Sequence, residues 1–286
     1  MALIDNLVSY WKLDEASGTL VDSHDNNDGT SNGSLTYGAT GIINDCLDFD
    51  GTDDYVTFAN EGDFDFENDN AFSLSIWLKP DTADTSIQVP ISKTKDEAPF
   101  RGFQFVTNFR GVSDAGKVDF DIISDAGGGD FIRVRSTNDT NLNDGGWHHY
   151  IITYDGSGAA SGVTIYEDGS ALTLTTNVDN LSGTILNNDA LSIGAKSDGA
   201  PNNQEIYNGL IDEVAVWSRE LTSTEVTELH NSGSGLAYPF SSGTNFQINI
   251  GDAWKSVEAI KMNIGDVWKN VPSAKINIGD VWKDIF

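Results

Sequence analysis

The sequence predicts an all-β protein, in which an antiparallel β-sandwich is followed by an array of short hairpins. Three observations predict this fold. Apolar and polar residues alternate along most of the chain, Gly, Asp and Asn interrupt the alternation at short intervals, and a 14-residue unit occurs three times near the C-terminus. We assign residues 1–240 to the sandwich and residues 241–286 to the repeats.

The alternating segments follow one another at the spacing of a β-sandwich, with YDGSG and YEDGS as tight-turn signals. In FSLSIWLKP (72–80), the side chains of Phe72, Leu74, Ile76 and Leu78 share one face, because successive residues of a strand point to opposite sides. The other predicted strands are VTF (56–58), FQFVTNF (103–109), VDFDIIS (118–124), FIRVRS (131–136), HHYIITYD (148–155), VTIYEDG (163–169), ALSIGA (190–195) and IDEVAVWS (211–218).

One segment, LTSTEVTELHNSG (221–233), has the pattern of a helix. Thr222 is a candidate N-cap, Glu225 follows three residues later as in a capping box, and Gly233 is the expected end. A single short helix after many strands indicates an antiparallel sandwich rather than alternating strands and helices.

The C-terminal repeat has the form IxIGDxWK. It occurs as INIGDAWK (248–255), MNIGDVWK (262–269) and INIGDVWK (276–283), with a period of 14 residues. Each copy predicts a β-hairpin that turns at Gly-Asp. A region of 46 residues is too small for much independent stability, so we expect the repeats to pack on another surface or to form a homotrimer with sister chains.

The chain is strongly acidic, with 44 Asp and Glu residues against 16 Lys and Arg and a net charge of −28. Such a charge repels nucleic-acid phosphates and anionic membrane surfaces and attracts cations. No stretch approaches the roughly 18 apolar residues of a membrane span. We therefore predict no nucleic-acid partner and no membrane insertion.

The single cysteine, Cys46, excludes an intrachain disulfide and is predicted to be a small core residue. The first residues, MALIDNLVSYWKLDEASG, show no basic region, apolar run or cleavage site of a secretory signal. If the protein acts outside a cell, we therefore expect another route of release, such as assembly in a virion and lysis of the host.

Three sets of segments resemble the laminin-G-like, concanavalin A-like jelly-roll family over roughly residues 5–235. The resemblance implies two curved antiparallel sheets and a function in binding rather than catalysis. The residues that carry it are LVSYWKLDEASGTLVDS (7–23) with CLDFDGTDDYVTF (46–58), FSLSIWLKP (72–80), and GGWHHYIITYDGS (145–157) with YNGLIDEVAVWSRELTSTEVTELHNSG (207–233).

The same resemblance implies a structural calcium ion, since many jelly-roll relatives hold one between the N-terminal segment, a backbone carbonyl and an Asp of the last strand. Carried onto this sequence, the implied ligands are Asp14, the carbonyl of Gly51, Asp53 and Asp212. The acidic turn DGTDD (50–54) is rich in the oxygen ligands that calcium prefers. Ordinary turn chemistry, in which Asp50 and Asp53 bond their own backbone, is the alternative.

A glycoside hydrolase of the laminarinase type is the enzymatic alternative, because such enzymes share this fold. Their Glu-x-Asp-x-x-Glu strand is missing here: Asp119 and Asp121 share a face without a Glu, and Asp212 and Glu213 are expected on opposite faces. The adjacent His148 and His149 are likewise expected to point apart. We predict that the protein is not an enzyme.

Carbohydrate binding fits the composition of the loops, because sugar sites combine aromatic rings with Asp, Asn or Arg. The candidates are Phe100, Arg101, Phe109 and Arg110 in one stretch and Asn202, Asn203, Gln204 and Tyr207 in another, although each could equally be a packed or solvated loop residue. Trp77 and Trp217 are instead expected to pack on the sheets.

The C-terminal repeats resemble the ends of bacteriophage virion proteins, notably tail, fibre and head-surface components. Together these features predict a non-enzymatic virion surface protein, in which the jelly-roll binds host or environmental glycans and the repeats join it to other virion proteins. A bacterial extracellular lectin or adhesin at the cell surface is one alternative. A decoration protein without a ligand is another.

Overall fold

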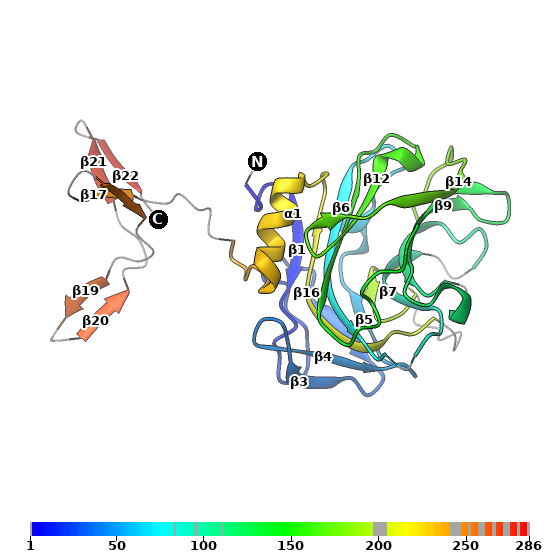
Figure 1. Cartoon of the computed structure of the whole chain (residues 1–286), viewed down its shortest axis with the longest axis horizontal. Helices are drawn as coiled ribbons and strands as arrows, with labels where there is room; N and C mark the ends of the chain where they lie inside the picture. The colour runs from blue at the N-terminus through cyan, green and yellow to red at the C-terminus, as the bar shows by residue number, and fades with distance from the viewer. Residues whose placement is uncertain are drawn as a thin grey trace. The chain divides into compact units, whose positions relative to one another are not determined.

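The computed structural model describes residues 2–82, 84–94, 97–109, 111–196 and 205–240, together with the backbone of six short strands between residues 247 and 284. The chain divides into two compact units, Leu3–Pro239 and Phe240–Phe286, and each is described by itself. The first unit is a sandwich of two antiparallel sheets, which confirms the predicted fold class (Figure 1).

The first sheet, called sheet A, has eight strands. It includes the strands within the segments 72–80, 145–157 and 207–233, which belong to the family resemblance. Its order is β13 (Ser170–Ala171), β12 (Val163–Glu167), β11 (His148–Tyr154), β6 (Phe72–Pro80), β16 (Asn208–Trp217), β4 (Asp45–Asp50) and β3 (Thr36–Thr40), with β1 (Leu7–Trp11) also paired to β16.

The second sheet, sheet B, also has eight strands, and its outer face carries most of the charged side chains described below. Its order is β14 (Leu174–Asp179), β10 (Asp130–Ser136), β9 (Val118–Asp125), β8 (Gly102–Thr107), β7 (Gln88–Thr94), β15 (Ser192–Ile193), β5 (Tyr55–Phe58) and β2 (Gly29–Asn32). Short 3-10 turns, η1 (Glu61–Phe64), η2 (Gly111–Asp114), η3 (Ala160–Gly162) and η4 (Asn231–Gly233), lie in the connections.

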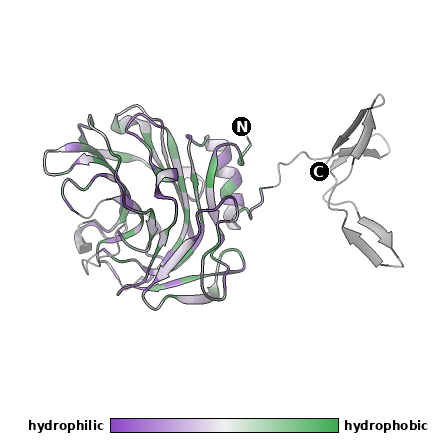
Figure 2. Cartoon of the chain, turned by 180° about the vertical axis from the view of Figure 1, so that it is seen from behind, coloured by the Kyte–Doolittle hydropathy of each residue, from purple (hydrophilic) through white to green (hydrophobic). Residues whose placement is uncertain are grey.

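The core lies between the two sheets and follows the alternation in the sequence. The predicted face of β6 is buried in it, where Phe72 meets Phe103 of β8 with ring centroids 5.0 Å apart. Trp11 of sheet A stacks on Phe58 of sheet B at 3.8 Å, and its indole N–H donates to the carbonyl of Asn27 at 2.7 Å. Each such buried side chain contributes about 1.5–3 kcal/mol relative to exposure. In Figure 2, hydrophobic stretches lie along the strands and hydrophilic residues gather in the loops.

The helix α1 (Ser223–His230) covers part of the outer face of sheet A (Figure 1). Its capping box is confirmed: Thr222 accepts from the amide of Glu225, whose carboxylate accepts from the amide of Thr222 at 2.9 Å. The predicted end at Gly233 is wrong, because Asn231 adopts the left-handed conformation that stops the helix and the following residues form the turn η4.

Trp77 and Trp217 pack on the sheet as the sequence predicts, and the adjacent His148 and His149 point apart. Trp77 is buried, and its ring lies parallel to that of His149 with centroids 4.5 Å apart and to that of His230 at 5.6 Å. Trp217 is fully buried, and its indole N–H donates to the carbonyl of Leu3. His148 instead bonds Asp144 and Asp168 at the rim of the sandwich.

The second unit contains three two-stranded antiparallel sheets, one in each repeat. The strands are β17 (Gln247–Ile250) with β18 (Ala253–Ser256), β19 (Lys261–Ile264) with β20 (Val267–Asn270), and β21 (Lys275–Ile278) with β22 (Val281–Asp284). The register is the same in each, since an Asn lies opposite a Trp in all three pairs.

Among the described residues, no helix has the length and apolar character needed to cross a membrane.

Candidate functional site

The outer face of sheet B carries buried ion pairs. The guanidinium of Arg133 donates two hydrogen bonds to the carboxylate of Asp121, at 2.6 and 2.7 Å, and Gln104 donates a third at 2.8 Å. Arg135 approaches a single oxygen of Asp119, Oδ1, with both its Nε and its Nη2 at 2.8 Å. Strand alternation explains the arrangement, because every second residue of β9 and β10 points away from the core.

Aromatic rings complete this cluster. The guanidinium carbon of Arg133 lies 4.1 Å from the ring centroid of Phe109 and 5.3 Å from that of Phe131. Asp119 and Asp121 are both fully buried, and burial raises the pKa of Asp119 to about 6, although Arg135 opposes the shift. Carboxylates held in this way position the strands and offer no accessible acid–base pair.

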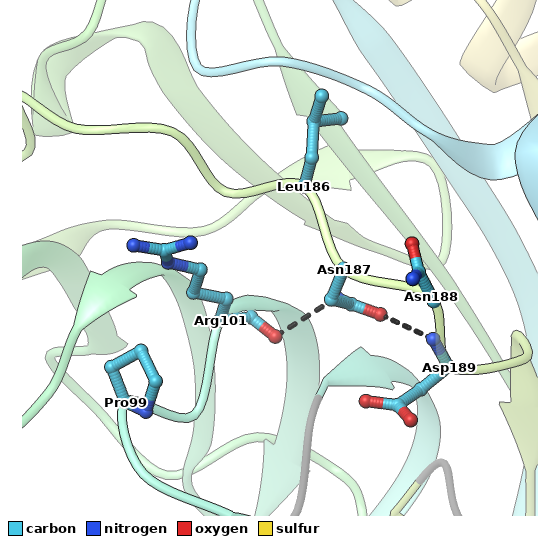
Figure 3. A pocket seen from close by; sticks show the side chains of 6 residues that line it. All are labelled: Pro99, Arg101, Leu186, Asn187, Asn188 and Asp189. Atoms are coloured by element: carbon cyan, nitrogen blue, oxygen red, sulfur yellow. Dashed lines mark hydrogen bonds between the residues drawn. The ribbon is translucent and has the colours of Figure 1, made fainter.

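A pocket of about 340 Å³ opens at the end of sheet B where β8 begins and β9 ends (Figure 3). Two loops line it, one before β8 and one between β14 and β15. Its lining residues are Pro99, Arg101, Leu186, Asn187, Asn188 and Asp189. The volume lies at the small end of the range of about 300–1,000 Å³ that is usual for ligand pockets.

Asn187 fixes the floor of this pocket. Its side-chain amide donates to the carbonyls of Arg101 at 2.9 Å and Lys93 at 3.2 Å, and its side-chain oxygen accepts from the amide of Asp189 at 2.9 Å. The Lys93 ammonium, only 2% exposed, bonds the Asn187 carbonyl at 3.0 Å. Gly102 allows this approach, since any Cβ there would collide with the carbonyl of Lys93. The floor is therefore rigid.

The remaining lining groups can contact a ligand. The Nε of Arg101 donates to the carbonyl of Ser124 at 3.2 Å, and the rest of its guanidinium keeps further donors. The amide side chain of Asn188 is exposed and carries both a donor and an acceptor. Leu186 is 39% exposed and, with Pro99, adds apolar surface. This combination of hydrogen-bonding groups and apolar surface suits a hydroxyl-rich ring.

The four implied calcium ligands do not meet at one point. Asp14 accepts from the amide of Asp45, and Asp212 lies close enough to Asp14 for their charges to interact. Gly51 and Asp53 follow the other end of β4, about 17 Å away at the usual rise of a strand. One ion cannot bind both groups, because calcium ligands lie about 2.3–2.6 Å from the metal.

A bulge in β16 changes the predicted geometry of the acidic pair. Ile211 and Val214 both face the core, so Asp212 and Glu213 between them both face outward, and the expectation that they lie on opposite faces is wrong. Glu213 takes a left-handed conformation, with φ of 48°, which absorbs the extra residue. Burial, with the neighbouring acids, raises the pKa of Asp212 to about 7 and that of Glu213 to about 8.

The acidic turn at 50–54 is the described cluster in which three carboxylates come within 4.8 Å of one another, namely Asp50, Asp53 and Asp54. Asp54 is buried and accepts from the amides of Ser34 at 2.7 Å and Asp50 at 3.1 Å. Asp50 accepts from the amide of Thr52. Turn hydrogen bonds thus account for Asp50 and Asp54.

The predicted sugar-binding residues divide between several places. Arg101 lines the pocket, and the ring of Phe100 beside it faces Lys196 at 5.5 Å. Phe109 belongs to the arginine cluster. Tyr207 is fully buried and packs on Phe49, so of its two interpretations the packed one holds. Arg110, Asn202, Asn203 and Gln204 lie outside the described residues.

Cys46 was predicted to be a core residue only from its neighbours in the sequence. Cys46 is fully buried, as expected. It lies on the outer side of sheet A, however, because the adjacent Leu47 faces the core. Burial, helped by the nearby charge of Asp212, raises the pKa of its thiol to about 12, so the thiol is unreactive.

The sequence matches the profile of the concanavalin A-like lectin/glucanases superfamily over residues 50–227, which is more than half of the chain. The chain belongs to this superfamily. The match includes the whole of β6, β11 and β16, three of the strands that carry the resemblance in the sequence. Comparison of the sequence with curated proteins gave no match.

Solved structures of the superfamily fold are similar at low identity. The binding domain of Paraclostridial Mosquitocidal Protein 1 has a TM-score of 0.61 at 16% identity, covering 81% of this chain and 53% of that one. The binding domain of botulinum neurotoxin serotype D has a TM-score of 0.57 at 13% identity, covering 80% and 52%. The chain thus spans about half the length of these toxin domains.

A third solved structure is similar to this chain over almost its whole length. It is domain 4 of AbnA, a GH43 extracellular arabinanase from Geobacillus stearothermophilus, in complex with arabinotriose. The TM-score is 0.52 at 18% identity, covering 78% of this chain and 97% of that domain. At such identities the likeness establishes the fold.

Sequence reasoning found Arg101 but missed the rest of the pocket. The floor depends on Lys93, Asn187 and Gly102, which belong to different segments of the chain. A partial signal is present in the run Asn187, Asn188 and Asp189, where three polar residues follow the apolar Leu186. Nothing in the local sequence places that run beside Arg101.

Proposed function

We propose that the jelly-roll unit is a non-enzymatic carbohydrate-binding domain and that the pocket beside Arg101 is its binding site. The observation that carries the proposal is the combination of a rigid floor, exposed hydrogen-bonding groups and apolar surface in one small pocket. Membership of the lectin/glucanase superfamily supports it, as does the arabinotriose bound by the similar domain of AbnA. The carboxylates of Asp119 and Asp121 on sheet B are buried in ion pairs with arginines, which supports a binding rather than a catalytic role.

The test is a glycan array probed with the full chain and with Arg101→Ala. We expect the variant to lose about tenfold in affinity, because one charged hydrogen-bond donor is worth roughly 1.5–3 kcal/mol at most and Arg101 shares its bonds with Ser124. Lys117→Ala is the matched control, because it also removes one positive charge. Lys117 lies before the first residue of β9, whereas the pocket lies at the other end of that strand. Equal affinity of both variants for every bound glycan contradicts this site.

We further propose that the protein is a bacteriophage virion surface component, a fibre, spike or head decoration, whose repeats anchor it or form a homotrimer. The identical register of the three hairpins supports equivalent use of the repeats. A bacterial extracellular lectin or adhesin at the cell surface is the alternative, and a laminarinase-type hydrolase is less well supported.

Multi-angle light scattering tests the role of the repeats. The mass of the full chain is compared with that of a chain ending at Ser241. We expect an oligomer, in the simplest case a trimer, that becomes a monomer on truncation, because isolated two-stranded hairpins are marginally stable in water and need a partner surface. Two monomers would exclude self-association and leave anchoring to another protein.

A structural calcium ion remains part of the proposal in a narrower form. The buried Oε1 of Glu213 has no described hydrogen-bond partner, and Glu213 lies beside Asp212 and within the electrostatic reach of Asp14. Three hard oxygen donors at this end of β4 suit calcium better than the divided set implied by the resemblance. Bound there, the ion would neutralise the buried carboxylates of Asp212 and Glu213. It would also join the segment after β1, which contains Asp14, to β16.

Removal of calcium is therefore expected to lower the melting temperature, because the buried carboxylates of Asp212 and Glu213 and the partly exposed one of Asp14 would lose their counter-ion. The measurement is a thermal melt with EDTA, with EDTA plus excess calcium, and with magnesium as the comparison ion. Glu213→Gln should reduce the effect of EDTA. An unchanged melt, together with no metal in the purified protein, would rule the ion out.

A further inference from the structure

Two imidazoles and an indole pack together where helix α1 meets the outer face of sheet A. The ring centroids are 4.5 Å apart for Trp77 and His149, 5.6 Å for Trp77 and His230, and 6.0 Å for the two histidines. All three rings are within 16° of parallel. Stacked rings lie about 3.5 Å apart, so three layers would separate the outer rings by about 7 Å. Every distance is shorter, and the histidines are the pair farthest apart, so they lie side by side on one face of the indole.

This arrangement favours the neutral form of His149. Its Nε2 lies 2.8 Å from the hydroxyl oxygen of Ser75. Its Nδ1 is buried and, like Nδ1 of His230, has no hydrogen-bond partner in the described part of the chain. An imidazolium carries an N–H on both nitrogens. Protonation of His149 would therefore bury a charge and leave one N–H without an acceptor, and both effects are costly.

The charged groups around His149 do not offset this cost. Asp168, in the turn between β12 and β13, already accepts from the backbone amide of His149 and bonds the ring of His148. His230 of α1 opposes a charge on His149, and the side chains that β6 places against the ring are uncharged. Burial, together with the effect of His230, lowers the pKa of His149 to about 3, although Asp168 acts in the other direction.

Helix α1 is held differently at its two ends. At the N-terminal end, Arg219 donates to the carboxylate of Glu225 at 2.6 and 2.9 Å, and Val226 is fully buried. Against the effect of burial, hydrogen bonds that include those from Arg219 lower the pKa of Glu225, so this ion pair persists in mild acid. At the C-terminal end, His230 packs on Trp77, and the end of a helix favours a positive charge. Acid therefore weakens the C-terminal end first.

We infer that His149 and His230 form an acid-sensitive latch, which releases the C-terminal end of α1 from sheet A as the pH falls. Above about pH 6.5, His149 is neutral in both the closed and the open state, and the latch stays closed. Below that pH the open state takes up a proton that the closed state excludes down to about pH 3. The opening equilibrium therefore rises about tenfold for each pH unit in this window. The latch does not depend on carbohydrate binding.

The experiment follows amide hydrogen exchange of the full chain by mass spectrometry, with each rate corrected for the intrinsic effect of pH. Exchange in α1 should rise about 30-fold between pH 6.5 and pH 5, while β6 and β11 stay protected. The double variant His149→Phe with Ser75→Ala keeps an aromatic ring against Trp77 without a titrating group, so its α1 exchange should change little. His148→Gln is the control and should respond as the natural chain does, because that ring lies outside the stack.

Titration of the natural chain gives a second measurement that needs no variant. Exchange of the imidazole C2–H, followed between pH 4.5 and pH 8, should show His149 titrating well below the ordinary value of about 6.5. A midpoint near 6.5 would overturn the inference, as would equal α1 exchange at both pH values. A rise shared by the whole sandwich would also overturn it, since that is global unfolding. An acid response that survives in the double variant would exclude His149 as the cause.

Discussion

Asp121→Ala should lower the free energy of unfolding by roughly 3–5 kcal/mol, the usual cost of removing one partner of a buried ion pair. Asp121 is fully buried and accepts from Arg133 twice and from Gln104 once. Without it, the guanidinium of Arg133, whose side chain is 20% exposed, keeps its charge but loses its counter-ion. The measurement is urea unfolding of the variant beside the natural chain.

The double variant Asp121→Leu with Arg133→Met separates the ion pair from the packing around it. Replacing both partners by apolar groups is often neutral, so the double variant should be much more stable than Asp121→Ala. Retained Phe109 and Phe131 would pack on the methionine as they do on the guanidinium. An Asp121→Ala variant within about 1 kcal/mol of the natural chain would contradict a tightly coupled network.

The stability of the protein should also fall as the pH rises from about 6.5 to about 9, owing to His148. Hydrogen bonds with Asp168 and Asp144, both at 2.9 Å, raise the pKa of His148 from 6.5 to about 9, with the Asp168 bond the largest cause and burial opposing it. The folded state then holds a proton that the unfolded state releases above pH 6.5. The stabilisation is complete below that pH and is lost above about 9.

The expected loss is about 1–2 kcal/mol rather than the full value of the shift, because Asp144 is 57% exposed and solvent screens its share. The measurement is urea unfolding at pH 6, 7, 8 and 9 for the natural chain and for Asp168→Asn, which keeps the shape of a residue in the left-handed conformation. The difference between the two curves isolates His148 from other titrating groups. Parallel curves would show that His148 does not contribute.

The fold was predictable because its signals are local and repeated. In β6 the alternation of Phe72, Leu74, Ile76 and Leu78 identified both the strand and its buried face, and the capping box of Thr222 and Glu225 identified the helix. The end of that helix was misplaced, since Asn231 can adopt the left-handed conformation before Gly233 is reached. The outward position of both Asp212 and Glu213 was missed because strict alternation fails at a bulge.

The candidate site was predictable only in part, since its residues come from separate segments. Arg101 was found as a polar residue beside an aromatic one, whereas Tyr207, chosen by the same reasoning, is a core residue against Phe49. Composition cannot distinguish the two, because burial depends on what the rest of the chain places against each residue. The implied calcium ligands also fall into two groups in the structure. Asp14 and Asp212 lie at one end of β4, and Gly51 and Asp53 follow its other end, so the two groups are far apart in space.

The sequence by itself determined the fold class, the buried faces of the strands, the superfamily and the acidic charge, because each follows from residue type and short-range order. Only the tertiary structure decided that Lys93 and Asn187 bond each other, that Gly102 lets them approach, and that Arg101 opens beside them. These contacts join residues about 86–94 positions apart in the chain. Their geometry depends on strand register and packing across the whole sandwich, and no local pattern encodes it.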